Sequence, residues 1–313
     1  MGGAVGSPAA ATVYRQPKFA VEMVSDITYA LGQVHESWRG RVSGTKDLML
    51  DAYRPVGAVG RLPVVTFVHG GGFRDGDKTD GAAKYFGDYF ASRGFLVISV
   101  NYRLMDEYGT VPEAIAQYVN GMALSDYKKN QHKAMYPAVR DVKAALRWLA
   151  NQATTWQVDL TRVAIIGNSA GAIIGIAVGA TDPDDFATEL SLAEDPTLSS
   201  THQAQSLPRI RAVVDFWGSG DAVDLYEGAY QTTRWRATKA PLMIVHGTDD
   251  ATIAYDEALY LQQRYQQSGA PYQFCALAGM GHGAWDGVCD GKTLDVLALE
   301  FIAKHLQLTV VEH

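Results

Sequence analysis

The sequence predicts an α/β protein, in which helices cover both faces of a mostly parallel, doubly wound sheet. Short apolar, β-branched runs alternate along the chain with segments of amphipathic helical pattern. The run FLVISVN at 95–101 is typical of a strand buried on both faces. Residues suited to chemistry follow directly after several of these runs, and functional loops of such sheets collect at the carboxyl ends of their strands.

Length and composition favour one globular domain. The chain has 313 residues, of which 47% are hydrophobic and 19% are charged, and α/β folds of this length form single domains. The formal net charge of −7 argues against nucleic acid or an anionic membrane surface as the main partner. No apolar run approaches the roughly 20 residues that span a bilayer. We expect a small-molecule substrate, while the oligomeric state is left open.

The domain organisation predicted is a flexible leader at 1–20 and a single domain at 21–313. The first eleven residues are rich in Gly, Ala, Ser and Pro, and lack the basic and apolar regions of an intact signal peptide. Two segments, 104–136 and 181–208, show no strong strand pattern. We expect these insertions to lie outside the sheet and to form a small cap.

The strands expected within this domain differ in pattern. The segment 48–55 alternates apolar and polar residues and ends at a proline, which indicates an antiparallel strand, and 26–29 is expected at an edge. The other runs are continuously apolar, as in buried parallel strands. The expected strands cover 26–29, 48–55, 62–69, 95–101, 163–166, 210–217, 241–246 and 272–277.

Helices are expected between these strands. The helix at 137–151 is the most regular, because Pro137 suits a first helical turn and the apolar positions after it form one stripe. An Ala/Gly/Ile-rich helix is expected directly after Ser169. The remaining helices are expected at 82–93, 255–267 and 293–306.

The most informative motif is the pentapeptide GNSAG at 167–171. An apolar run precedes it and a helical segment follows it, which is the pattern of a nucleophile elbow. Such a turn holds a serine in strained backbone geometry, so small residues are required two positions before and after it. Gly167 and Gly171 meet that need, and Ser169 is the candidate nucleophile.

A nucleophile of this kind needs an oxyanion hole. His69 and three consecutive glycines follow the strand 62–69 directly, and glycines let the backbone turn tightly and present N–H groups. The N–H groups of Gly71, Gly72 and Ala170 are the candidate donors, worth roughly 3 kcal/mol of barrier each. The alternative for the glycines alone is an ordinary turn.

Two further loops offer the base and the acid. His282 lies in GMGHG at 279–283, after the last expected strand, where flanking glycines allow a loop to place the imidazole over the serine. Asp249 and Asp250 follow the strand 241–246, and one of them is expected to orient the imidazole. The other is expected to form an Asx turn or a helix cap.

Candidate substrate contacts are less sharply defined. Aromatic side chains in the expected rim (Tyr108, Tyr118, Tyr127, Trp217 and Trp285) have the chemistry to stack on an aryl group or a sugar ring, or serve only as packing. Phe73 after the glycines and Asn168 before the serine complete the candidates.

The two cysteines, Cys275 and Cys289, flank the segment that contains His282. Two interpretations stay open. A disulfide would tie down the histidine loop and favour an oxidising, secreted or periplasmic, location. Two free buried thiols would favour the cytoplasm.

The full set of motifs resembles the α/β-hydrolase superfamily, within the carboxylesterase/lipase group that carries an HGGG oxyanion motif (the hormone-sensitive-lipase-like and feruloyl-esterase-like branches). The matching segments run from about residue 48 to the C-terminus: HGGGF at 69–73, NYRL at 101–104, PAVRDVKAALRWL at 137–149, GNSAG at 167–171, HGTDD at 246–250 and GMGHG at 279–283.

The resemblance implies Ser169 as nucleophile, His282 as general base and Asp250 as triad acid, since the family's acid falls four residues after the histidine of HGTDD. It implies no metal and no cofactor. Asn168 departs from the family, in which Asp, Glu or Gly usually precedes the serine. Arg103 and Asp141 are expected to form a buried structural ion pair.

The function expected is therefore hydrolysis of carboxylic esters through an acyl-enzyme, on small, aryl-linked or sugar-linked esters such as acetyl or feruloyl esters. An amidase or arylformamidase with the same triad is the first alternative, and a peptidase is a weaker one. A catalytically silent binding protein is a further alternative, although such proteins usually lose a triad member and none is missing here.

Overall fold

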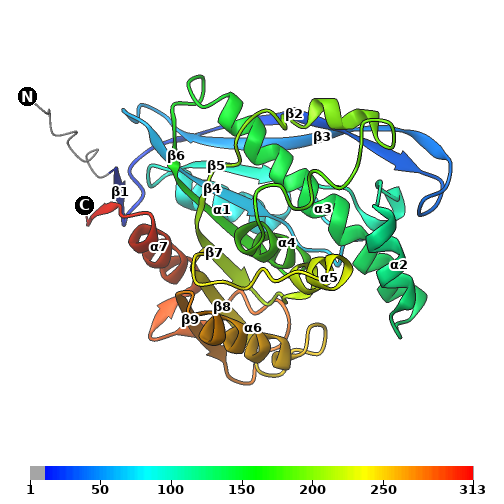
Figure 1. Ribbon diagram of the computed structural model, residues 1–313. Coiled ribbons are helices and arrows are strands. Elements are labelled where there is room, and N and C mark those ends of the chain that lie inside the picture. Colours follow the sequence, from blue (N-terminus) through cyan, green and yellow to red (C-terminus); the bar gives the residue numbers. More distant parts are fainter. Residues whose placement is uncertain (1–10, 313) are drawn as a thin grey trace, which may run out of the picture.

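The computed structural model describes residues 11–312 and contains a central eight-stranded sheet (Figure 1). The strand order is β2-β3-β5-β4-β6-β7-β8-β9; β2, β3 and β5 pair antiparallel and the other neighbours pair parallel. These strands are β2 (Val21–His35), β3 (Val42–Pro55), β4 (Leu62–Val68), β5 (Leu96–Val100), β6 (Val158–Asn168), β7 (Ile210–Phe216), β8 (Leu242–Gly247) and β9 (Tyr272–Leu277). The predicted mostly parallel α/β sheet is confirmed.

Helices cover both faces of this sheet. The strand β4 shows why, because Val64 and Val68 pack in the core on one face and Val65 and Phe67 in the core on the other. Helices α3, α4, α5 and α6 contribute to the first core, and α1 and α7 to the second. The helices are α1 (Gly81–Ala91), α2 (Glu113–Gly121), α3 (Asp126–Asn151), α4 (Ala170–Ala180), α5 (Asp221–Tyr230), α6 (Tyr255–Ser268) and α7 (Leu294–His305), with short 3-10 turns at Met105–Glu107 and Pro196–Ser200.

Two small sheets lie outside the central one. β1 (Thr12–Tyr14) pairs parallel with β12 (Thr309–Val311), so the two ends of the described chain meet beside α7 (Figure 1). β10 (Val288–Cys289) and β11 (Lys292–Thr293) form a hairpin before α7. Strand structure therefore begins at Thr12, before the predicted leader boundary at residue 20, because β1 pairs with β12 at the other end of the chain. Residues 1–10 lie outside the described part.

The first long strand extends well beyond its predicted length. An edge strand was expected at 26–29, and it is confirmed as part of β2, which has 15 residues. Most side chains of its first half are exposed, so this half carries no apolar pattern to predict it from. Its hydrogen bonds to β3, with three irregularities in register, hold it instead.

The helix predicted to begin at Pro137 begins at Asp126, and Ser125 caps it by accepting the N–H of Lys128. Proline inside a helix removes one hydrogen bond and costs roughly 3 kcal/mol. Tyr136 and Ala138 beside it are fully buried, and this packing outweighs the local penalty. The insertion 104–136 is therefore partly helical, since it contains α2 and the first turns of α3.

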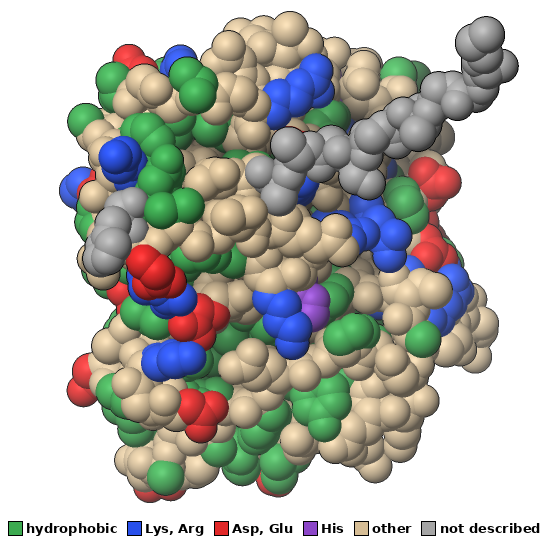
Figure 2. Space-filling model, turned by 90° about the vertical axis from the view of Figure 1, so that its left-hand side faces the viewer, with side chains coloured by type: hydrophobic (Ala, Val, Ile, Leu, Met, Phe, Trp, Pro, Cys, Tyr) green, Lys and Arg blue, Asp and Glu red, His purple; other side chains and the backbone are tan. Residues whose placement is uncertain are grey.

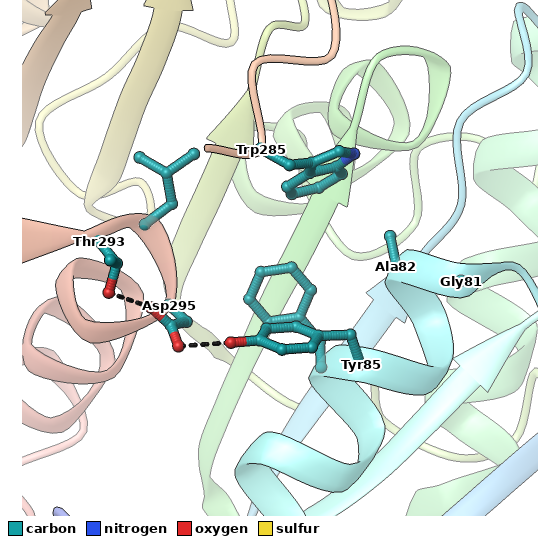
Figure 3. Close-up of a pocket in the computed structure, with 8 residues that line it drawn as sticks. Gly81, Ala82, Tyr85, Trp285, Thr293 and Asp295 are labelled. Carbon is teal, nitrogen blue, oxygen red and sulfur yellow. Dashed lines mark hydrogen bonds between the residues drawn. The ribbon is translucent and has the colours of Figure 1, made fainter. Parts of the chain in front are cut away.

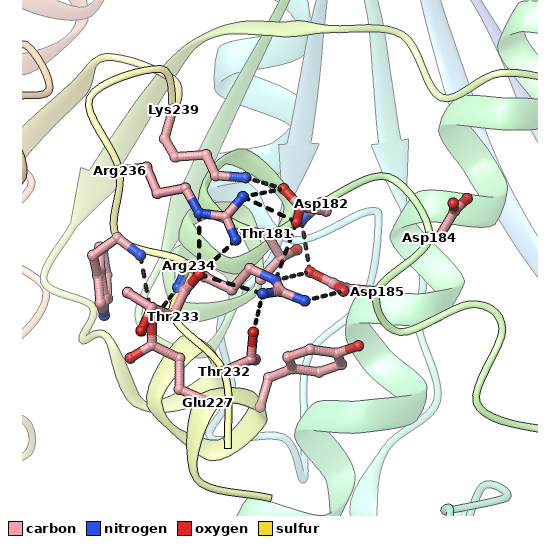
Figure 4. A network of polar contacts seen from close by, with 12 residues as sticks. Thr181, Asp182, Asp184, Asp185, Glu227, Thr232, Thr233, Arg234, Arg236 and Lys239 are labelled. Carbon is pink, nitrogen blue, oxygen red and sulfur yellow. Dashed lines mark hydrogen bonds and ion pairs between the residues drawn. The ribbon is translucent and has the colours of Figure 1, made fainter. Parts of the chain in front are cut away.

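The second insertion, 181–208, packs along the side of the molecule. Arg234, in the loop after α5, donates to Asp185 with Nε at 2.5 Å from Oδ2, and Lys239 pairs with Asp182 (Figure 4). The Nζ of buried Lys143 in α3 donates to the carbonyl oxygens of Asp182 and Asp185 at 2.8 and 2.7 Å. These contacts fix the insertion to α3 and to the loop after α5.

Charged side chains of both signs occur on the surface (Figure 2). On the face shown in Figure 2, charged side chains of both signs are scattered among hydrophobic and uncharged ones. Within residues 11–312, no helix is long and apolar enough to cross a membrane.

Candidate active site

Ser169 stands in the turn between β6 and α4, with φ of 52° and ψ of −123°. This left-handed backbone is strained for a side chain other than glycine. A Cβ atom at position 167 would lie 2.3 Å from the carbonyl oxygen of Gly171, and one at position 171 would lie 2.0 Å from that of Val68. Both positions therefore require glycine, as the sequence predicts.

The structure brings Ser169, His282 and Asp250 together from three separate loops. The Nε2 atom of His282 lies 3.0 Å from Oγ of Ser169, and its Nδ1 lies 2.7 Å from Oδ2 of Asp250. The side chain of Asp249 instead accepts from the hydroxyl of Thr248 at 3.1 Å. The imidazole is thus placed to accept the serine proton, with Nδ1–H held by the Asp250 carboxylate.

The Asp250 carboxylate is fully buried and densely hydrogen-bonded. Burial on its own raises the pKa of a carboxyl group, but hydrogen bonds from His282 and from the N–H groups of Thr252 and Ile253 outweigh burial and hold the Asp250 pKa below its usual range. The Nε2 atom of His246 lies 3.3 Å from Oδ2 of Asp250 and donates to the Ile253 carbonyl oxygen. Burial lowers the pKa of His246, so this imidazole stays neutral. The ionised Asp250 is available to orient His282.

The glycine loop after β4 is held by its carbonyl groups. The Gly70 carbonyl accepts from Nδ1 of His69 at 2.8 Å and from the Tyr102 hydroxyl at 3.3 Å, and the Gly71 carbonyl accepts two backbone N–H groups. In a trans peptide, the C=O and the following N–H point in opposite directions. The N–H groups of Gly71 and Gly72 therefore point away from these partners. Within residues 11–312 neither they nor the Ala170 N–H have a hydrogen-bond partner.

A small cavity of about 80 Å³ lies above Ser169. One wall comes from a face of α3, where Lys128, Gln131, His132 and Met135 follow at helical spacing. Gln131 also donates to the Gly72 carbonyl at 2.9 Å. The other lining residues are Gly72, Phe73, Ala170, Ile173, Asp221, Thr252 and Ile253.

Sequence reasoning missed most of this wall. Phe73 is the only predicted substrate contact that lines this cavity in the described chain. The insertion 181–208 contributes nothing to it, whereas the first turns of α3 do. The spacing of residues 128, 131, 132 and 135 fits one face of a helix, and this was the signal that could have predicted the wall. The prediction that the helix begins at Pro137 left these residues outside it.

The other predicted contacts lie elsewhere. The Tyr108 ring packs on Trp38 at 5.4 Å, and Trp217 is 1% exposed, with its ring 6.2 Å from that of His282. These contacts agree with the packing alternative that the sequence left open for both rings. Asn168 lies beside Gly70 outside the cavity lining. Trp285 is 39% exposed and lines a different cavity.

A disulfide joins Cys275 of β9 to Cys289 of β10, with 6.2 Å between their Cα atoms. It closes the loop that carries His282. The two cysteines are therefore bonded to each other and are not free thiols. The ion pair expected between Arg103 and Asp141 is also confirmed, with 2.5 Å between Nη2 and Oδ1 and both side chains buried.

Comparison with known families identifies the chain. The sequence model described as the prolyl oligopeptidase family matches residues 87–309, more than half of the protein. The chain belongs to the prolyl oligopeptidase family. A second model, described as BD-FAE, matches residues 50–122, which contain the glycine loop of this family member.

Curated relatives of this prolyl oligopeptidase family member are matched over parts of their length. The chain is 34% identical to fumonisin B1 esterase of Sphingopyxis macrogoltabida over 137 residues, 42% of this chain and 23% of the relative. It is 31% identical to carboxylesterase NlhH of Mycobacterium tuberculosis over 134 residues, 42% of this chain and 33% of the relative. The matched part thus spans a third or less of each of these relatives.

Solved structures share the fold over nearly the whole chain. A truncated carbohydrate esterase from gut microbiota aligns with a TM-score of 0.62 at 17% identity, covering 94% of this chain and 99% of that one. Esterase 2 of Thermogutta terrifontis, solved with propionate bound, aligns with a TM-score of 0.57 at 20% identity, covering 83% and 90%. The fold is that of the α/β hydrolases, as the motifs predicted.

Proposed function

We propose that this protein hydrolyses carboxylic esters of small acyl groups through an acyl-enzyme on Ser169. The hydrogen-bonded series Ser169–His282–Asp250, at 3.0 and 2.7 Å, is the observation that carries the proposal. The esterases among its relatives support the reaction class. The cavity of about 80 Å³ is far smaller than the 300–1,000 Å³ or so of drug-sized ligand sites, which favours short acyl groups.

In the proposed reaction, His282 Nε2 takes the Ser169 proton while Oγ attacks the ester carbonyl carbon. The carbonyl oxygen becomes an oxyanion that the N–H groups of Gly71, Gly72 and Ala170 stabilise. The alcohol leaves with the proton from His282, and a water molecule then cleaves the acyl-enzyme by the same route. Asp250 stays ionised throughout and stabilises the imidazolium.

Substitution of the proposed nucleophile tests this assignment. We expect Ser169→Ala to lower kcat for p-nitrophenyl acetate by about 10⁴-fold or more, because a triad without its nucleophile loses nearly all of its contribution. Circular dichroism should show an unchanged fold. An Asp249→Asn variant is the matched control for Asp250→Asn, and only the latter should lose activity. Activity retained in Ser169→Ala would contradict the proposal.

Amide hydrolysis is the second candidate, and the family match favours it. The chain is also 25% identical to dipeptidyl aminopeptidase BIII of Pseudoxanthomonas mexicana over 237 residues, 71% of this chain and 30% of that protein. Rates on p-nitrophenyl acetate and on 4-nitroacetanilide, which carry the same acyl group, separate the two. We expect kcat/KM to be far higher for the ester, and the reverse result would support an amidase.

A further inference from the structure

A second cavity of about 430 Å³ opens at the same end of the sheet as Ser169. It lies between the first turns of α1 and α7, which begin beyond the carboxyl ends of β4 and β9 (Figure 3). Functional sites of open α/β sheets collect at this end. We call it the Trp285 cavity; its lining is Gly81, Ala82, Tyr85, Phe86, Trp285, Thr293, Leu294 and Asp295.

The walls of the Trp285 cavity are aromatic and fixed in place. The centre of the Trp285 ring lies 4.5 Å from that of Trp217 and 5.7 Å from that of Phe86. The Trp285 residue is still 39% exposed. Tyr85 is 52% exposed, and its hydroxyl donates to Oδ2 of Asp295 at 2.6 Å. Because both rings are already held, a ligand that stacks on them loses little of its binding energy to ordering.

This cavity is coupled to the catalytic histidine through a single ring. The Trp217 ring lies 6.2 Å from that of His282 and 4.5 Å from that of Trp285. Trp285 also follows His282 by three residues in the loop that the disulfide closes. In the proposed reaction the leaving alcohol takes its proton from His282. The Trp217 ring contacts the rings of both His282 and Trp285, so the Trp285 cavity lies on the His282 side of Ser169, whereas the small cavity above Ser169 lies toward α3.

We infer that the Trp285 cavity binds an aromatic ring carried by the alcohol or phenol part of the ester, an inference that rests on the proposed function. The polar side chains of Tyr85, Thr293 and Asp295 are paired with one another, because Asp295 accepts hydrogen bonds from both Tyr85 and Thr293. A hydroxyl-rich sugar ring would find few free partners there. An aryl ring gains stacked or edge contacts with Trp285 and Tyr85, worth roughly 0.5–1.5 kcal/mol each beyond the area that they bury.

Filling the cavity tests the inference on substrates. Ala82 lines it from the first turn of α1, so Ala82→Phe should occupy the space of the ligand ring. We expect KM for 2-naphthyl acetate to rise at least tenfold, while kcat and KM for ethyl acetate stay within twofold of wild type. Ala237→Phe, on an exposed loop, is the matched control and should change neither substrate. A Tyr85→Ala variant, which removes one wall without adding bulk, should also raise KM for the naphthyl ester alone.

A binding measurement on an inactive variant tests the aromatic site separately from the proposed ester hydrolysis. Calorimetry with 2-naphthol on Ser169→Ala should give a Kd that rises at least tenfold when Ala82→Phe is added. An unchanged Kd, or competition by methyl xyloside at lower concentration than by 2-naphthol, would overturn the inference while ester hydrolysis by the wild type stands. If 2-naphthol binds as expected but the wild type hydrolyses no ester, the proposed function fails and with it the assignment of the ring to a substrate.

Discussion

At the scale of single residues, the geometry of the proposed oxyanion hole depends on side chains that do not line the cavity above Ser169. Tyr102 is buried and stacks on the His69 ring at 4.4 Å, and its hydroxyl donates to the carbonyls of His69 at 2.9 Å and Gly70 at 3.3 Å. Burial lowers the His69 pKa, so the ring stays neutral and Nδ1–H donates to Gly70. Together these bonds set the direction of the Gly71 N–H.

Removal of the Tyr102 hydroxyl should therefore affect catalysis more than stability. We expect Tyr102→Phe to lower kcat about tenfold, or roughly 1.4 kcal/mol, with KM nearly unchanged, because the hydroxyl acts on a donor that stabilises the transition state. The loss of one buried hydrogen bond should lower the free energy of unfolding by about 1 kcal/mol. Steady-state kinetics and thermal melts measure both effects.

Tyr265→Phe is the matched control for this change. Tyr265 is equally buried, and its hydroxyl donates to the carbonyl of Ala240 at 3.1 Å, away from the glycine loop. This variant should lose similar stability and keep its kcat. Equal kcat in the two variants would show that the Tyr102 hydroxyl has no role in positioning the loop.

At the scale of elements, strands with a continuous apolar run and turns with a glycine motif can be predicted from the sequence. The strands β4 and β5 are buried on both faces, so their composition identifies them, and steric need fixes Gly167 and Gly171. Helix α3 shows the limit, since its first turns are polar and Pro137 suggests a later start. The wall that it builds over Ser169 depends on where this helix crosses the sheet, which no local pattern records.

The strand β7 contains a carboxyl group whose ionisation should depend on folding. Burial raises the Asp215 pKa to about 7, although the Gly218 N–H donates to Oδ1; Oδ2 has no partner within residues 11–312. An unfolded aspartate titrates near 3.9, so the folded state binds more protons between about pH 4 and pH 7. The free energy of unfolding should therefore fall as the pH rises through this range.

Asp215→Asn removes this titration while keeping the size of the side chain. We expect the variant to melt at a higher temperature than wild type at pH 8, and the difference to shrink or reverse at pH 5, where Asp215 is protonated. Thermal melts of both proteins at the two pH values measure this. A wild-type advantage at pH 8 would contradict the raised pKa of Asp215 in the folded protein.

At the scale of the whole molecule, the proposed triad is a long-range construction. Ser169 follows β6, Asp250 follows β8 and His282 follows β9, so the sheet brings together residues 113 positions apart. The first two are anchored by a buried helix and by backbone N–H groups. His282 lies in an exposed loop with glycines on both sides, and glycine loses more conformational freedom on ordering than any other residue. The disulfide is the covalent restraint on that loop.

The double variant Cys275→Ser, Cys289→Ser tests this restraint. The cysteines are 14 residues apart, and a loop of that length closed by a disulfide contributes about 3 kcal/mol of stability. We expect the free energy of unfolding to fall by about this amount, and kcat to fall about tenfold as His282 loses its fixed distance to Ser169. Reductant should reproduce both effects in the wild type and leave the double variant unchanged. Free thiols in the denatured, unreduced wild type would show that the bond is absent, and an unchanged kcat in the variant would show that the rest of the loop suffices to hold His282.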